Sequence, residues 1–183
     1  MKKLILCVCT IALLSNLSAQ KFFSKDAKVS FNANSPVEKI EGTNNKGTLI
    51  IDAASSKIEA AVLVKGFHFE KALMEEHFNE NYMESGKFAK STFAGEITDF
   101  KTVNLSKDGD YKVSIKGKLT MHGVTKDVQS TATLTVKGGA IAKGKASFKA
   151  LMADYNINIP SVVREKIAKE AKIDIEAIMQ QLK

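Results

Sequence analysis

The segment at residues 111–136 alternates between apolar and polar side chains, and this pattern constrains the fold more than any other feature of the chain. From Tyr111 to Met121 every odd-numbered position is apolar or Gly, and every even-numbered position is polar. A period of two is typical of a β-strand with one dry face and one wet face. The alternation resumes in the opposite phase at Val128. We therefore expect a β-hairpin, with Gly123 supplying the positive φ that a tight connection often needs.

Shorter alternating segments recur along the rest of the chain. We expect further strands at residues 28–33, 37–40, 47–52, 57–69, 87–93, 95–103 and 141–150. Asn44–Gly47 and Ala53–Ser56 are rich in small and turn-forming residues and are expected to be turns. Many short strands with alternating apolar residues favour an all-β fold, either an antiparallel barrel or a sandwich.

One segment between these strands has the spacing of a helix. Leu73, Phe78 and Tyr82 recur with Met74 and His77 at intervals of one, three and four residues, while Glu and Asn occupy the other positions. This spacing gives a helix an apolar face. We expect a short helix at about residues 71–82.

The C-terminal part of the chain contains a second segment with helical spacing. Val163, Ile167 and Ala171 predict a helix at about residues 161–171, directly after Pro160. Residues 172–180 return to alternation, which predicts a final strand that helps to close a barrel. A continued helix is the alternative for this last stretch.

The N-terminus has the pattern of a signal peptide. A basic pair, Lys2 and Lys3, precedes an apolar run at residues 4–14 and a short stretch of small residues that ends at Ala19. The apolar run is shorter than the about 20 residues that span a bilayer. We expect cleavage near Ala19, an exported protein in the periplasm or outside the cell, and one domain at residues 20–183.

Cysteine usage and charge exclude several functions. Cys7 and Cys9 both fall in the expected signal peptide, so the mature chain would have neither a disulfide nor a thiol nucleophile. The formal net charge of +7 comes from scattered lysines; Arg164 is the sole arginine and Trp is absent. Nucleic-acid sites usually rely on Arg and aromatic stacking, so we expect no nucleic-acid partner. A weak contact with anionic membrane surfaces is compatible with the charge.

The hairpin also resembles a known family. The run from Gly117 to Lys126, Gly-x-Leu-Thr-x-His-Gly-Val-Thr-Lys, is similar to the core signature of the YceI-like lipid-binding family, and the likeness extends to residues 73–82 and 93–97. This resemblance implies a secreted or periplasmic, lipocalin-like antiparallel β-barrel that binds polyisoprenoid or other amphiphilic molecules. In such a barrel we expect the helix at about 71–82 to lie over one opening, where its apolar face would close the pocket.

Small residues on the inward faces of the expected strands predict a cavity. They are Gly117, Ser130, Ala132, Ala142, Gly144 and Ala146. An eight-stranded barrel is about the size at which side chains fill the interior or leave room for one ligand. The alternative is that small and large residues alternate only to fit the taper of a filled barrel.

The predicted ligand-binding residues combine these inward positions with a concentration of phenylalanine between residues 67 and 100. A flexible polyprenyl chain needs such a lining because it gains about 25 cal/mol for each Å² of apolar area removed from water. The same aromatic residues could instead simply form the core. The candidate cavity-lining residues are Val62, Val64, Phe67, Phe69, Leu73, His77, Phe78, Tyr82, Phe93, Val113, Ile115, Leu119, Ala132, Leu134, Gly144, Ala146 and Phe148.

These patterns, together with the resemblance, predict an exported binding protein that carries an isoprenoid lipid, an isoprenoid quinone or a related lipid, and that is not an enzyme. Two alternatives remain open. One is an enzyme on the same barrel with His77 or His122 as general base, and the other is a cell-envelope interaction module with a filled core. The histidines lack the spacing of a metal site, so we expect neither a metal nor a cofactor. The sequence does not predict the oligomeric state.

Overall fold

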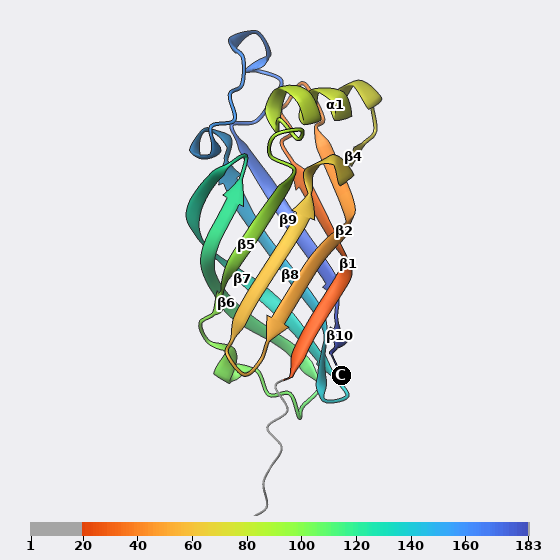
Figure 1. Ribbon diagram of the computed structural model, residues 1–183, viewed down its shortest axis with the longest axis vertical. Helices are drawn as coiled ribbons and strands as arrows, with labels where there is room; N and C mark the ends of the chain where they lie inside the picture. The colour runs from red at the N-terminus through yellow and green to blue at the C-terminus, as the bar shows by residue number, and fades with distance from the viewer. Residues whose placement is uncertain (1–19, 183) are drawn as a thin grey trace, which may run out of the picture.

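The alternating segments pair side by side into antiparallel strands that close into a barrel (Figure 1). The computed structural model describes residues 20–182. The barrel consists of β1 (Lys21–Asn32), β2 (Glu41–Asp52), β3 (Lys57–Leu63), β5 (Lys90–Ile97), β6 (Gly109–Met121), β7 (Val124–Lys137), β8 (Ala140–Leu151) and β9 (Glu170–Ile178). Each of these strands pairs with the next along the chain, and β9 pairs with β1. The predicted all-β, lipocalin-like barrel is confirmed.

Two very short strands extend the barrel wall. β4 (His68–Phe69) pairs with the start of β2, and β10 (Gln180–Gln181) pairs with the start of β1. The predicted closing strand is therefore confirmed, because β9 bonds both to β8 and to β1. The continued-helix alternative for residues 172–180 is wrong.

The β6–β7 hairpin has the predicted connection. Its strands pair continuously from Gly109 opposite Val136 to Met121 opposite Val124. His122 and Gly123, between them, have φ values of 50° and 73°. Left-handed conformations at both central residues match the twist of the strands and are typical of a type I′ turn.

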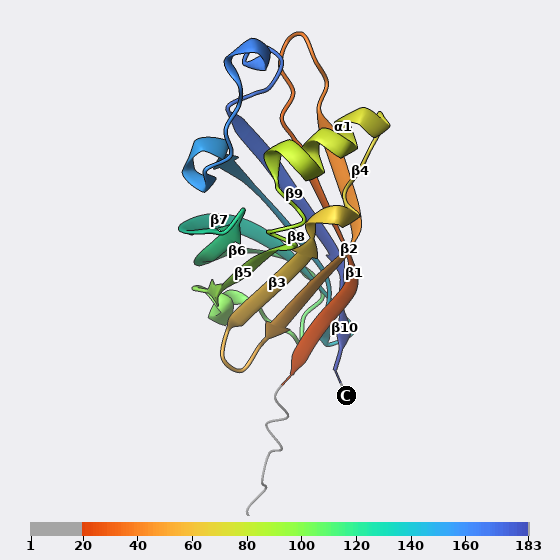
Figure 2. The ribbon, with the colours of Figure 1, turned by 45° about the horizontal axis from the view of Figure 1, so that its top comes forward.

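The two ends of the barrel differ. In Figure 1 the lower end carries the β2–β3 and β7–β8 turns and residues 98–108. The interior at this end is filled with buried apolar side chains that include Phe22, Val136 and Ile141. The upper end carries the helix α1 (Ala72–His77), which continues as a π-helical turn at Phe78–Tyr82. Figure 2 shows α1 at this end beside the 33–40 loop and the 152–169 segment. The short helix at about 71–82 is confirmed.

The first strands are longer than the sequence predicted. β1 begins at Lys21 instead of residue 28, and residues 44–47 lie within β2 instead of forming a turn. The pairing shifts where Lys25 and Asp26 face outward in β1, and shifts again at the corresponding outward pair in β2. Such bulges reverse the alternation of apolar and polar residues, so that the sequence of each long strand looks like that of a shorter strand.

Other expected strand boundaries were also wrong. Residues 37–40 form a loop, which is held by hydrogen bonds from the Ile40 N–H to the Asn34 side chain and from the Glu38 N–H to the Ser35 hydroxyl. The expected strand 57–69 is interrupted by a 3-10 turn at Val64–Gly66. A single strand, β5, replaces the two strands expected between residues 87 and 103, and a 3-10 turn follows it at Phe100–Thr102.

The second helix, expected at 161–171, is wrong. Residues 152–169 form two short 3-10 turns, at Met152–Tyr155 and Ser161–Val163, joined by irregular chain. The Ala168 N–H donates to the Ala33 carbonyl and ties this segment to the 33–40 loop. Val163, Ile167 and Ala171 line the interior at the upper end of the barrel, and this role explains their apolar spacing without a helix.

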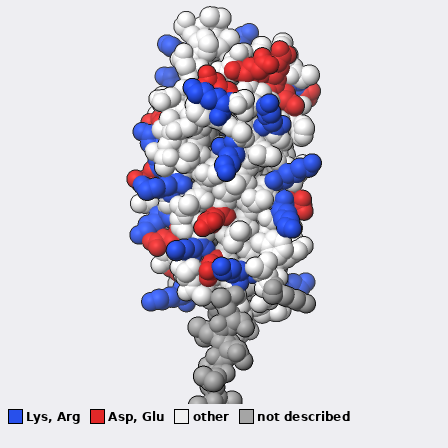
Figure 3. Space-filling view, viewed as in Figure 1, with Lys and Arg blue, Asp and Glu red and all other residues white. Residues whose placement is uncertain are grey.

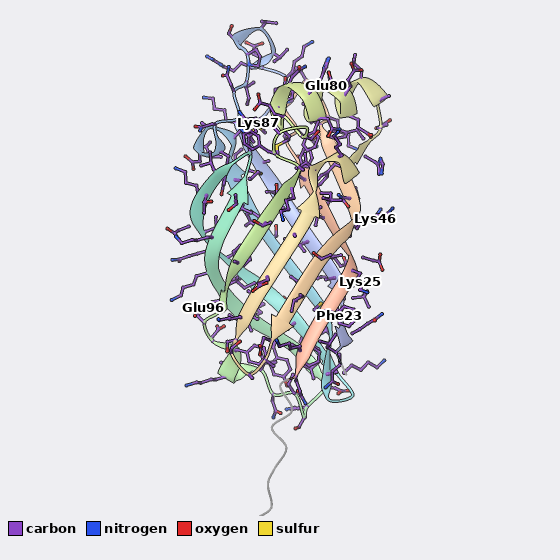
Figure 4. All side chains as sticks on the ribbon, viewed as in Figure 1. Phe23, Lys25, Lys46, Glu80, Lys87 and Glu96 are labelled. Carbon is purple, nitrogen blue, oxygen red and sulfur yellow. The ribbon has the colours of Figure 1, made fainter. Side chains whose placement is uncertain are left out.

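Charged side chains cover the outside of the barrel. In Figure 4 Lys25 and Lys46, which lie in the two bulges, project from the outer wall. Figure 3 shows lysines scattered over this face and acidic residues gathered at the upper end, where α1 carries Glu75 and Glu76. Within residues 20–182, none of the helices has the length and apolar character needed to cross a membrane.

Candidate ligand cavity

The barrel encloses a cavity of about 550 Å³ that reaches from its middle to its upper end. This volume lies within the range of about 300–1,000 Å³ that is usual for small-molecule sites. The middle and upper parts of the interior are therefore not filled by the protein's own side chains, contrary to the filled-core alternative. The predicted residues that line this cavity are Val62, Phe67, Phe69, Leu73, His77, Phe78, Tyr82, Phe93, Ile115, Leu119, Ala132, Leu134, Gly144, Ala146 and Phe148.

Two predicted lining residues lie elsewhere. Val64 is fully buried in a cluster with Met83 and Tyr155, because the 3-10 turn at the end of β3 takes it out of the strand alternation. Val113 is buried in the filled lower end together with Phe22. The strand phase was correct for Val113, but its level along the barrel axis was not predictable from alternation.

Several residues that line the cavity were not predicted from the sequence. On β9, Ile173 and Ile175 line the cavity; their alternation predicts a strand but does not show that it faces a cavity. On β1 and β2, Val29 and Leu49 line it as well, but the phase shifts at the bulges hid these positions. Two of the small residues expected to leave space are not in the lining. The Phe93 ring occupies the space beside Gly117. Ala142 lies at the register shift between β7 and β8.

The cavity is apolar along its depth and charged at its upper end. Glu38, Lys71, His77 and Lys166 belong to the loops and the helix at this end and contribute to the lining. Lys71 Nζ lies 3.1 Å from Glu38 Oε1, so this ion pair joins the start of α1 to the 33–40 loop. Exposed ion pairs are usually worth less than about 1 kcal/mol, so the pair can open at little cost.

A cluster of four phenylalanines packs the end of the helix against the barrel wall. The Phe78 ring, just after α1, stacks on Phe31 of β1 with centroids 5.2 Å apart and rings inclined by 16°. The rings of Phe69 and Phe67 lie 5.0 Å and 5.6 Å from that of Phe78. Aromatic pairs at these separations contribute about 0.5–1.5 kcal/mol each beyond their area burial. The helix is thus packed against one side of the opening, as its apolar spacing predicted.

The hydroxyl of Tyr82 is the titratable group that burial affects most clearly at the cavity. Tyr82 ends the π-helical turn and lines the interior. Burial raises the pKa of its phenol above the ordinary value, because the charged phenolate would lose hydration. Burial thus favours the neutral phenol of Tyr82 even further than in water.

His122 has a structural position outside the cavity lining. Its Nδ1 lies 2.9 Å from the Tyr155 carbonyl oxygen, and since a carbonyl only accepts, Nδ1 carries the proton. The remaining nitrogen, Nε2, is 3.3 Å from Glu84 Oε2. The ring also packs edge-on against Phe88, at 4.6 Å. These contacts fix the β6–β7 turn to two upper-end segments and leave His122 away from a ligand.

The other histidines lie near the opening. His77 is exposed and lines the upper end of the cavity, whereas His68 Nδ1 lies 3.5 Å from Glu75 Oε2 on the outside of the barrel. Of the two histidines considered as a general base, His77 alone faces the cavity. In the described part of the chain, no group of three or more His, Cys, Asp or Glu side chains has the arrangement of a metal site.

Comparison with known sequences agrees with the barrel and its motif. The YceI-like domain matches residues 21–179. A UPF0312 protein of Pseudomonas fluorescens is 32% identical over 96 residues, which are 50% of this chain and 48% of that protein. A UPF0312 protein of Vibrio vulnificus is 29% identical over 112 residues, 58% of this chain and 56% of that protein. The matches thus span about half the length of these curated relatives.

Solved structures share the fold. A polyisoprenoid binding domain from Saccharophagus degradans, implicated in plant cell wall breakdown, has a TM-score of 0.74 at 10% identity, covering 90% of this chain and 99% of that one. BcnA from Burkholderia cenocepacia has a TM-score of 0.66 at 16% identity, with coverages of 84% and 96%. Because the domain match extends over nearly all of the described residues, the chain belongs to the YceI-like family.

Proposed function

We propose that this chain is an exported carrier that holds an isoprenoid or related lipid in its barrel and releases it unchanged. The observation that carries the proposal is the apolar cavity of about 550 Å³ inside a closed barrel with one filled end. Removing an apolar chain from water into such a site yields about 25 cal/mol per Å², with few polar contacts required. The description of the Saccharophagus degradans domain as polyisoprenoid binding supports this class of ligand.

The distribution of charge suggests how an amphiphile would lie. Its apolar chain would extend down the barrel between Ile115 and Ala146, and its polar end would stay near Lys71 and Glu38 at the opening. A buried charge without a partner is costly, so the polar end has no favourable place deeper in the apolar interior. This orientation requires no chemical step, which fits a carrier better than an enzyme.

The test is to ask whether the purified protein contains and takes up lipid. Mass spectrometry of solvent extracts should find a co-purifying isoprenoid lipid, and a fluorescent polyprenyl or fatty-acyl probe should bind the delipidated protein. The Ala146→Phe variant, which fills the middle of the cavity, should bind the probe at least about tenfold more weakly, a loss of about 1.4 kcal/mol.

The matched control is Thr131→Phe. Thr131 faces solvent from β7, the strand that pairs with β8, so the same ring added there should leave probe binding unchanged. An extract without lipid, together with a wild-type protein that takes up no probe, would overturn the carrier function. Equal binding by wild type and Ala146→Phe would show that the ligand lies outside the barrel.

The export part of the proposal rests on the N-terminal sequence, whose residues 1–19 lie outside the described residues. We propose cleavage near Ala19 and a mature protein in the periplasm or outside the cell. Intact-mass analysis of protein from the cell envelope should give a chain that begins near Gln20. Retention of Met1, or a lipid on Cys7, would contradict this localisation.

A further inference from the structure

The closed end of the cavity lies partway down the barrel. The lining reaches Leu134 on β7, Gly144 on β8, and Ile51 and Ile58 on β2 and β3. It includes neither Val136 nor Ile141, the next inward residues below Leu134 and Gly144. Val136 is 1% exposed and Ile141 is fully buried, and both pack in the filled lower end with Phe22. The cavity therefore ends at Leu134 and Gly144 on β7 and β8, and Ile51 and Ile58 form its closed end on β2 and β3.

Gly144 lacks a side chain at this point without a steric need for glycine. A Cβ atom there would lie 3.7 Å from Leu134 Cδ2 and 3.9 Å from Leu49 Cδ2, which are ordinary contacts. Gly95 and Gly117 are different, since a Cβ on either would lie less than 3 Å from backbone atoms of the facing strand. Glycine weakens the interior of a strand, so its presence at Gly144 calls for another reason.

The inward residues of β8 increase in size towards the opening. Above Gly144 come Ala146 and then Phe148, each two residues and about 6.6–6.8 Å further along the strand. A larger side chain at Gly144 would extend into the closed end and shorten the space along the barrel axis. Removal of the Leu49 side chain, which faces Gly144, would lengthen that space.

We infer that Gly144, with Leu49 and Leu134 facing it, sets the maximum length of the apolar chain that the barrel accepts. This inference rests on the proposed carrier function. The closed end would thus select among ligands of the same chemistry by the length of their apolar chain. A chain that reaches Gly144 gains no further burial from additional carbons. The part of a longer chain that does not fit in the cavity remains at the opening.

The experiment measures displacement of a fluorescent fatty-acyl probe by a series of straight-chain alcohols of increasing length. For the wild type, each added methylene should raise the affinity about fourfold until the chain reaches Gly144, after which the affinity should stay level. In Gly144→Leu this limit should occur at a shorter chain. In Leu49→Ala it should occur at a longer chain, and in the outward-facing Thr131→Leu it should not move.

The outcomes separate this inference from the carrier function. If the wild type binds the series but all variants reach their limit at the same length, the inference is wrong and the carrier function stands. The inference is also wrong if Gly144→Leu binds every alcohol more weakly but reaches its affinity limit at the same chain length as the wild type. If the wild type binds no alcohol and no probe, the carrier function itself fails. Should Gly144→Leu not fold, Gly144→Ala must still shorten the limit while Leu49→Ala lengthens it.

Discussion

Gly95 of β5 and Gly117 of β6 face each other so closely that a Cβ on either residue would lie within 3 Å of the other's Cα. The Phe93 ring completes the contact, with its Cζ atom 2.8 Å and 2.7 Å from the two Cβ positions. The space beside these glycines thus belongs to an aromatic ring of the cavity wall. This arrangement distinguishes them from Gly144, which borders open volume.

The two kinds of glycine should respond differently to the same substitution. Gly117→Ala should destabilise the protein by about 1–3 kcal/mol, because the new methyl group has to displace the Phe93 ring and the facing strand. Gly144→Ala should be neutral or stabilising by up to about 1 kcal/mol, since it removes the entropic cost of glycine without a clash. Denaturant unfolding of both variants checks this, and equal destabilisation would contradict it.

The second prediction concerns which side chains of β6 face the barrel interior and which face solvent. Ile115 is buried inside the barrel, while its neighbour Lys116 is exposed and pairs with Glu96 at 2.9 Å. Ile115→Asp should unfold or aggregate the protein, because an unpaired carboxylate would enter an apolar interior. Lys116→Asp should cost less than about 1 kcal/mol, through the lost exposed pair and repulsion from Glu96. Similar melting temperatures for the two variants would show that the strand phase is reversed.

The parts of the fold that the sequence predicted well are those in which one rule holds without interruption. From Tyr111 to Met121 the alternation is unbroken, so the strand, its inward face and the turn at Gly123 were all predicted correctly. The helix after Lys71 was predicted because its apolar residues recur at helical spacing without interruption, and Phe78 and Tyr82 of this set are partly buried against the barrel.

The errors occur where a local pattern has two physical explanations. In β1 and β2 a bulge reverses the alternation, and a reversal looks like the end of a strand when the partner strand is unknown. Val163 and Ile167 have helical spacing, yet their apolar character comes from lining the opening. The level of Val113 below the cavity depends on the tilt and stagger of all the strands, which no single segment encodes.

Acid should weaken one particular set of contacts on the outer wall. Glu176 of β9 pairs with Lys143 and lies 3.6 Å from Lys145 Nζ, both on β8. The hydrogen bond with Lys143 lowers the pKa of Glu176 below its ordinary value and raises the pKa of Lys143. A lowered carboxyl pKa contributes stability above the unfolded value of about 4.3, and this contribution is lost as the pH falls through the folded value.

Glu176→Gln should therefore melt at a lower temperature than wild type near pH 7. The difference should shrink as the pH falls below about 4.3 and should vanish once the wild-type carboxyl is protonated in the folded protein as well. The effect should be small and should shrink with added salt, because the pair is exposed. Glu59→Gln, an exposed carboxylate change on β3, serves as the control. A gap between wild type and Glu176→Gln that persists or grows in acid would contradict this assignment.

The aromatic cluster predicts that α1 can be loosened without unfolding the barrel. Phe78 joins the helix to Phe31, Phe67 and Phe69, whereas the strands are held by their own backbone ladders. Phe78→Ala should lower the free energy of local opening for residues 72–82 by about 2–4 kcal/mol, somewhat less than for a fully buried phenylalanine. Amide hydrogen exchange should accelerate in this segment and stay unchanged in β6 and β7.

The same change should make a bound probe dissociate faster, because Phe78 lines the cavity where the helix borders its opening. Phe23→Ala provides the control, since Phe23 lies on the outer wall below Lys25, whose Nζ is 5.8 Å from the ring. That variant should leave both exchange in residues 72–82 and probe dissociation unchanged. If Phe78→Ala instead accelerated exchange equally in α1 and in the β6–β7 hairpin, the helix and the barrel would unfold as one unit, and α1 could not open on its own to admit a ligand.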